Sequence, residues 1–430
     1  MAEATLRIRD ESTVHFRPLT FLPPGHGREE WIVGHEPSDT AISLPEVGIV
    51  AIQHLLSGAT VAHARAATSQ KCDEDIDVAD LVEGLAGLGF VEALDGRRMP
   101  ETASIGQRWL ARVPPAAVAW IYSSPLLIFY AVLAISGPIL LLLDSAIRPQ
   151  AHALLWSASY SVDTITLLVL APLLLLKHEL GHLLAGRGKG LQAELTFGHR
   201  LVYLVVVSRI AAVWTLRRRE RLLIYSAGML NDLVFAGVGS LLLFAAQEHL
   251  VALAAPLKGL VALLVLSEYL GVAWEFQVFL KTDVYHILAD LTGRHDLPEQ
   301  ARALVIGFYR RILSAIRRRN IPGARGETIA ERADWLTVGY TLLAVIAIGG
   351  TLVWFVVYLI PATVLAIGGE TAQVVVGLRD GQWLAALDGA MALAGQSIVF
   401  VLLAWSWLRE HRARRRRVAQ LAEFEIQVAR

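Results

Sequence analysis

Six long apolar stretches constrain the fold of this 430-residue chain more than any other feature. They cover about residues 122–144, 157–185, 223–246, 252–275, 335–360 and 387–408. As a helix, each is long enough to cross the hydrocarbon core of a bilayer, for which about 20 residues suffice. Hydrophobic residues make up 55% of the chain and charged residues only 18%, against roughly a quarter in soluble domains. The sequence therefore predicts a mainly α-helical, polytopic membrane protein with about six transmembrane helices.

Basic residues predict how these helices are oriented. They gather between the second and third stretches, between the fourth and fifth, and in the tail 411–430, whereas the opposite loops carry little beyond Arg148 and Arg379. By the positive-inside rule, the basic loops and both termini lie in the cytoplasm. We interpret the arginine runs as anchors at the membrane surface and expect no nucleic-acid partner, since the net charge is zero.

The second stretch ends in His178-Glu179-Leu180-Gly181-His182, an H-E-x-x-H motif. On a helix the two imidazoles share one face, where both can bind one metal ion, and the glutamate can take a proton from water at that ion. A chance match is the alternative. Ionisable groups at the end of a membrane span are costly, however, and mark function by default. The motif therefore predicts a hydrolytic metal centre inside a membrane.

Two imidazoles need a third protein ligand, which leaves a fourth position for water. Asp283 is the best candidate, because it follows the fourth stretch on the same cytoplasmic side as the histidines. His286 is the second choice, with an ordinary polar contact as the alternative. Glu268 and Glu275 are also unusual in or at the end of a span, although a wet cavity or the membrane boundary would explain either. Cys72 is the only cysteine, so a cysteine-based site is excluded and Zn²⁺ held by two histidines and a carboxylate is expected.

Three segments together resemble the site-2 protease family of intramembrane zinc metalloproteases, most closely its bacterial peptide-processing branch. They are the motif at 178–182, the segment Leu280-Lys281-Thr282-Asp283, and Ala227-Gly228-Met229-Leu230-Asn231-Asp232 between them. The resemblance covers about residues 115–410. One departure is the residue after the aspartate, which is usually glycine in an Asn-Pro-x-Asp-Gly setting and is Val284 here.

The resemblance implies a role for each site residue. His178, His182 and Asp283 would bind zinc, and Glu179 would act as the general base. Asn231 would line the site and steady the substrate carbonyl. The alternative for Asn231 is a polar contact where two helices pack closely.

The segment 191–215 is not a span. Alternation at 195–197 and a β-branched run at 205–207 predict short strands joined near Gly198. A strand edge beside the metal could hold a substrate extended, as a protease requires. A surface hairpin without substrate contact is the alternative.

Residues 1–112 are soluble in composition and long enough for one small core. We expect strands at 14–21, 31–33 and 90–94 and helices at about 45–57, 60–69 and 77–88. Pro45 suits the first helical position, Gly58 ends that helix, and Asp77 can cap the third helix.

This winged-helix order resembles the PqqD-like domains that recognise leader peptides of ribosomally made peptide natural products. The matching words lie at 42–45, 55–60 and 80–91. Winged helices also bind DNA, but the acidic stretch 73–77 argues against phosphate contact. A purely structural cap is the remaining alternative.

The expected organisation is a peptide-recognition domain at 1–112, an intramembrane metalloprotease domain at 113–410 and a basic cytoplasmic tail at 411–430. The expected function is zinc-dependent cleavage of a precursor peptide in natural product biosynthesis, as in daptide-like pathways, at the cell membrane. One alternative is cleavage of a membrane-anchored signalling protein. Another is a non-catalytic peptide-binding membrane protein or transport accessory, and an intact Glu179 favours the enzymes.

Overall fold

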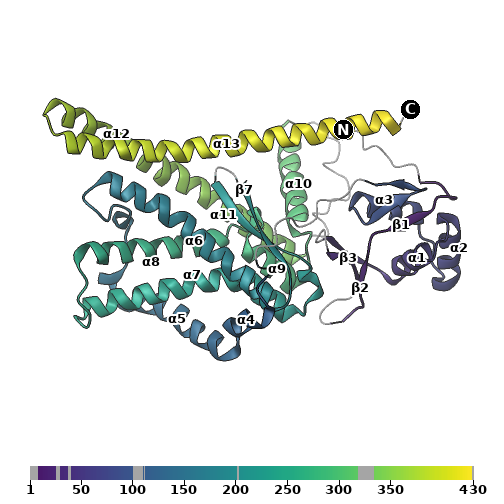
Figure 1. The fold of residues 1–430 in the computed structure, drawn as a ribbon. Coiled ribbons are helices and arrows are strands. Elements are labelled where there is room, and N and C mark those ends of the chain that lie inside the picture. Colours follow the sequence, from purple (N-terminus) through teal and green to yellow (C-terminus); the bar gives the residue numbers. More distant parts are fainter. Residues whose placement is uncertain are drawn as a thin grey trace.

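The computed structural model describes residues 8–25, 30–36, 40–99, 110, 112–200, 203–317 and 334–428. These residues are mostly helical. A bundle of long helices occupies one end of the molecule, and a small α/β domain, formed by the start of the chain, occupies the other (Figure 1).

The N-terminal domain contains two small antiparallel sheets and three helices. The first sheet has the order β1-β5-β6 and the second β2-β3-β4. The strands are β1 (Val14–Phe16), β2 (Thr20–Leu22), β3 (Trp31–His35), β4 (Thr40–Leu44), β5 (Val91–Leu94) and β6 (Arg97–Arg98), and the helices are α1 (Glu46–Leu56), α2 (Val61–Cys72) and α3 (Val78–Gly87). One core of buried aliphatic side chains around Ile52, Leu55, Val82 and Phe90 joins them.

Local signals in this domain were largely sufficient. All three helices are confirmed, and the Asp77 side chain accepts the Ala79 and Asp80 backbone N–H groups at the start of α3. Gly58 has a φ of +89° just after α1 and ends it as expected. Pro45 is the N-cap of α1 rather than its first helical residue, because its ψ of 162° keeps it extended. The expected strand at 14–21 is two strands in different sheets, and β4 lies where no strand was expected.

Six helices are long and apolar enough to cross a membrane, in agreement with the number expected. They are α5 (Ser124–Leu143), α6 (Tyr160–Gly188), α7 (Arg218–Gln247), α8 (Ala255–Glu275), a continuous helical segment Trp335–Arg379 and Trp383–Arg409 within α13 (Trp383–Val428). Helix α7 packs against α5, α6 and α8 and is the centre of the bundle.

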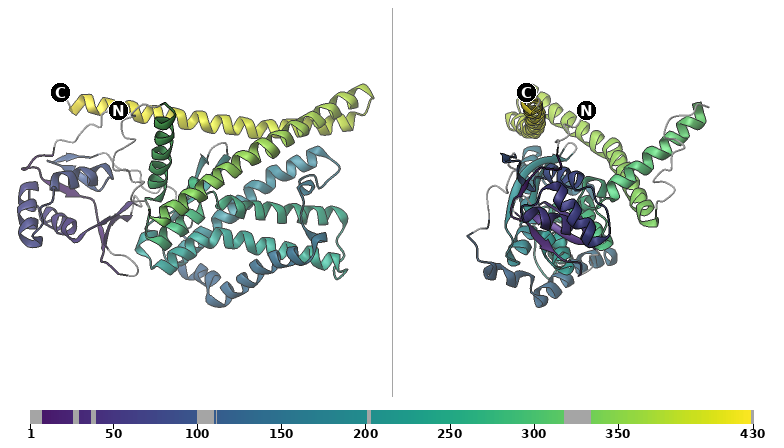
Figure 2. Two further views of the ribbon diagram at one scale, coloured as in Figure 1. Left: turned by 180° about the vertical axis from the view of Figure 1, so that it is seen from behind. Right: turned by 90° about the vertical axis from the view of Figure 1, so that its right-hand side faces the viewer.

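The fifth segment differs from the sequence expectation. It consists of α11 (Trp335–Trp354), a π-helical turn (Phe355–Leu359) and α12 (Ile360–Arg379), so residues expected to form an outer loop are helical. Pro361 suggests a helix end, but the wide turn before it accommodates the ring and the missing N–H. At 1.5 Å per residue the segment is about 67 Å long, roughly twice the hydrocarbon core. It crosses the bundle obliquely and then runs alongside α13 (Figure 2).

Two smaller elements complete the region around the HELGH motif. The strands β7 (Ala193–Arg200) and β8 (Tyr203–Ile210) form the expected antiparallel hairpin. Gly198 pairs with Val205 inside the ladder, so the predicted turn near Gly198 is wrong; the connection at 201–202 lies outside the described residues. After α8, the short helix α9 (Asp283–Thr292) begins at Asp283 and packs against α7. It is followed by α10 (Leu297–Arg317).

Candidate metal centre

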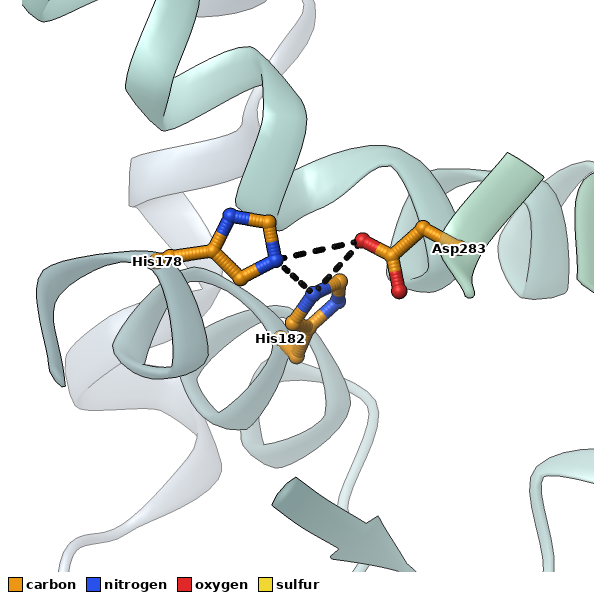
Figure 3. Close-up of side chains that lie close together, drawn as sticks. All are labelled: His178, His182 and Asp283. Atoms are coloured by element: carbon orange, nitrogen blue, oxygen red, sulfur yellow. Dashed lines mark hydrogen bonds and ion pairs between the residues drawn. The ribbon is translucent and has the colours of Figure 1, made fainter. Parts of the chain in front are cut away.

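Helices α6 and α9 bring His178, His182 and Asp283 together (Figure 3). The two histidine Nε2 atoms are 3.2 Å apart. Asp283 Oδ2 lies 2.9 Å from His182 Nε2 and 3.3 Å from His178 Nε2. Ligand atoms about 2.0–2.1 Å from a tetrahedral zinc ion lie about 3.4 Å from one another. The triangle formed by these three atoms is close to that size.

The outer nitrogens of both rings already have partners. His182 Nδ1 lies 2.7 Å from the carbonyl oxygen of Ile224 and His178 Nδ1 lies 2.7 Å from Asp232 Oδ2. Both oxygens can only accept here, so each Nδ1 donates its proton and each neutral ring presents the lone pair of Nε2 to the triangle. Asp283 Oδ2 is also buried and receives no hydrogen bond from the described residues. Three electron-rich atoms with no donor between them fit a bound cation.

Gly228 on α7 leaves the space next to this triangle open. A Cβ atom at this position would lie 2.4 Å from His182 Nε2 and 2.5 Å from His178 Nε2. A Cβ atom at Gly181 would lie 2.7 Å from the carbonyl oxygen of Ala227, so α6 and α7 are in close backbone contact here. Tyr122 supports the motif from outside the bundle, because its hydroxyl donates to the Gly181 carbonyl at 3.0 Å. Burial raises the pKa of Tyr122, which keeps this donor protonated.

Gly228→Ala is therefore expected to lower zinc affinity by at least about 10-fold, because the methyl group occupies space beside both Nε2 atoms. Chelator competition on the purified protein measures the affinity. Gly239→Ala is a control on the same helix, where the added carbon meets a movable Val265 methyl group far along α7. Unchanged zinc affinity in Gly228→Ala would contradict the assigned position of the ion.

Glu179 faces the same cavity and is held by the hairpin. Its Oε2 accepts the Ser208 backbone N–H at 2.7 Å. Ala211 N donates across the hairpin to the Gln192 carbonyl, and strand groups alternate in direction. The N–H groups of Ser208 and Ile210 therefore point away from β7, along an open strand edge on the side of Glu179.

The cavity around these residues has a volume of about 740 Å³. It is lined by apolar residues of α6, by acidic and aromatic residues of α7, α8 and α9, and by the end of β8, including Leu167, Leu170, Leu174, Tyr225, Trp274, Glu275, Ser208, Arg209 and Ile210. Ala41 from β4 of the N-terminal domain also lines it. At Gly34 on β3, an added Cβ would lie 2.3 Å from the Trp214 ring, so the N-terminal domain packs directly beside the cavity.

The other residues singled out in the sequence have different positions. His286 lines the cavity and stacks on Tyr225 with ring centroids 5.5 Å apart, but it is not in the group of three ligands. Glu275 Oε2 accepts the backbone N–H of Asp283 at 2.9 Å and thereby fixes the start of α9. Asn231 is not among the described residues that line the cavity. Its Nδ2 donates to the Lys177 carbonyl at 3.2 Å, which supports the helix-contact alternative over contact with a substrate.

Sequence reasoning missed Asp232. Its carboxylate binds His178 through one oxygen and Lys177 Nζ, at 2.7 Å, through the other. Lys177 also pairs with Glu268 at 2.6 Å. An acidic residue inside an apolar helix was the available signal, but only the packing of α6 against α7 identifies its partner.

The chain matches no family model, no curated protein and no solved structure. The functional argument therefore depends on the geometry of the site.

Proposed function

We propose that the chain is an intramembrane zinc endopeptidase that cleaves a precursor peptide. The observation that carries this proposal is the placement of three donor atoms, two imidazole Nε2 and Asp283 Oδ2, in the same buried cavity as Glu179. Two histidines and one carboxylate form a common ligand set for hydrolytic zinc sites, which keep one position open. The six apolar helices support a location in the membrane, with the site within helices of the bundle.

When bound, a zinc ion at such a site lowers the pKa of water towards 7 and polarises a carbonyl group. Glu179 accepts a proton from the attacking water as the water oxygen bonds to the scissile carbonyl carbon. It then donates this proton to the amine nitrogen as the C–N bond breaks. The Ser208 N–H holds one carboxylate oxygen of Glu179, which leaves the other for the proton.

The cavity suits an extended peptide with apolar side chains. Leucines of α6 line one side and the end of β8 lines another. A helix satisfies its own peptide groups, whereas an extended segment can pair with the free N–H and carbonyl groups of a strand edge. We infer that the substrate binds along the edge of β8 that carries Ser208 and Ile210.

Cleavage of an apolar peptide library by the purified protein in lipid vesicles tests the proposal. Fragments detected by mass spectrometry are expected to disappear with a chelator and to return when zinc is added. Fragments that persist without metal would contradict it.

The N-terminal domain is well placed to recognise the precursor, because β4 is an edge strand and contributes Ala41 to the cavity wall. A leader paired with this domain would raise the local concentration of the cleavage segment near Glu179. The proposed biosynthetic role, maturation of a ribosomally made peptide natural product, is supported by this arrangement and by the resemblance to PqqD-like domains.

Deletion of residues 1–99 is expected to raise the precursor concentration for half-maximal cleavage by about 10²-fold or more, with zinc content unchanged. The measurement is the cleavage rate against concentration of a precursor isolated by its retention on the full chain. The same precursor without its leader is the control and should be cleaved equally by both proteins. Equal half-saturation for the intact precursor would exclude the recognition role.

The proposed orientation places both termini and the basic loops in the cytoplasm. After replacement of Cys72, cysteines at Arg310 and Arg412 are expected to be shielded from an impermeant thiol reagent in intact cells. A cysteine at Asp380, which is exposed after α12, should be labelled. External labelling at Arg310 would overturn the six-span arrangement.

A further inference from the structure

We infer that Lys177 is a positioning residue of the metal centre, which acts through Asp232 on His178 and is itself held by Glu268. The inference rests on the proposed metal site but concerns residues outside its ligand set. The three side chains come from α6, α7 and α8, so they connect the helices at the level of the His pair.

The contacts form an unbroken chain. Lys177 Nζ lies 2.6 Å from Glu268 Oε2 and 2.7 Å from Asp232 Oδ1. Asp232 Oδ2 lies 2.7 Å from His178 Nδ1. The side chains of Asp232 and Glu268 are only 5% and 2% exposed, so water contributes little to their hydrogen bonding.

This arrangement fixes Asp232 at both oxygens. A carboxylate that met only His178 could rotate about its side-chain bonds and would leave Oδ1 buried without a donor, which is costly. With Lys177 on Oδ1, Oδ2 is directed at His178 Nδ1. The ring then has its proton on Nδ1 and its lone pair on Nε2, which faces Asp283 and His182.

Glu268 explains how Lys177 reaches Asp232. Lys177 precedes His178, and neighbouring residues on a helix point about 100° apart, so its side chain leaves the metal face. The ammonium group lies between α7 and α8, 4.7 Å from the centroid of the Phe235 ring. Glu268 holds it there, and one lysine serves two carboxylates.

The test measures zinc affinity by chelator competition, together with the visible spectrum of the cobalt-substituted protein, which reports ligand orientation. Lys177→Met is combined with Glu268→Gln, so that no buried carboxylate loses its cation without compensation. This double variant is expected to bind zinc about 10–100-fold more weakly and to show a changed cobalt spectrum. Asp232→Asn alone is expected to have an effect of the same size.

Because Lys177 acts through Asp232, adding Asp232→Asn to the double variant should cause no further loss. Glu268→Gln alone should stay within about threefold of the wild-type affinity, since its amide oxygen can still accept from Lys177. Lys177→Arg, which keeps the charge and the donors, should also stay within about threefold, and its retention would separate positioning from folding. Glu370→Gln is the matched control, because Glu370 is an equally buried carboxylate on α12 that accepts from Gln396.

Losses that simply add in the triple variant, or wild-type affinity and an unchanged cobalt spectrum in the double variant, would overturn the inference while leaving the zinc site intact. A wild-type protein that binds neither zinc nor cobalt would instead overturn the proposed function.

Discussion

Glu179→Gln is expected to lower zinc-dependent peptide cleavage by about 10²–10⁴-fold while bound zinc stays at the wild-type level. Glutamine has nearly the same shape, and its amide oxygen can still accept the Ser208 N–H. It cannot accept a proton from water at neutral pH, so only the proton transfer is lost. Cleavage of the peptide library in vesicles and metal analysis of the same samples measure the two effects.

The control for this variant is Glu370→Gln, which makes the same chemical change in α12, away from the metal centre. It should retain both zinc and cleavage. Cleavage at the wild-type rate by Glu179→Gln would show that Glu179 is not the base and that the proposed mechanism is wrong.

Alanine at His178, His182 or Asp283 is expected to lower bound zinc in purified protein well below one ion per chain. Each substitution removes one of three ligands, so its effect should exceed the roughly 10–100-fold loss typical of a residue that supports a ligand. His286→Ala is the matched control, because this histidine lines the same cavity but lies outside the triangle of donor atoms. Metal analysis after gel filtration provides the measurement.

The outcome for Asp283→Ala is the most informative of the three. Asp283 stands before Val284 where the resembling family usually has glycine, so the sequence supports it less strongly than the histidines. Full zinc retention in this variant would reject Asp283 as the third ligand.

The elements that the sequence predicts well depend on neighbours along the chain. The six apolar helices follow from length and composition, and the shared face of His178 and His182 follows from the helical repeat. Asp283 could be proposed from the order of the spans, because both segments end on the same side. The caps at Asp77 and Gly58 are likewise local.

The remaining features depend on tertiary packing. Asp232 becomes a partner of His178 only because α6 and α7 approach closely at Gly181 and Gly228. The bond between Glu179 and Ser208 requires the hairpin to lie against α6, and no sequence spacing encodes it. The helix beyond Pro361 was not anticipated because a π-helical turn accommodates a residue that normally ends or kinks a helix.

X-ray absorption at the zinc edge of the purified wild-type protein tests the central claim most directly. We predict one zinc ion per chain with a nitrogen and oxygen shell, in which two imidazoles lie at about 2.0–2.1 Å and a carboxylate oxygen at about 2.0–2.2 Å. The imidazole signal should be absent in His178→Ala. A protein that binds no zinc, or zinc with sulfur as its main ligand, would contradict a centre built from His178, His182 and Asp283.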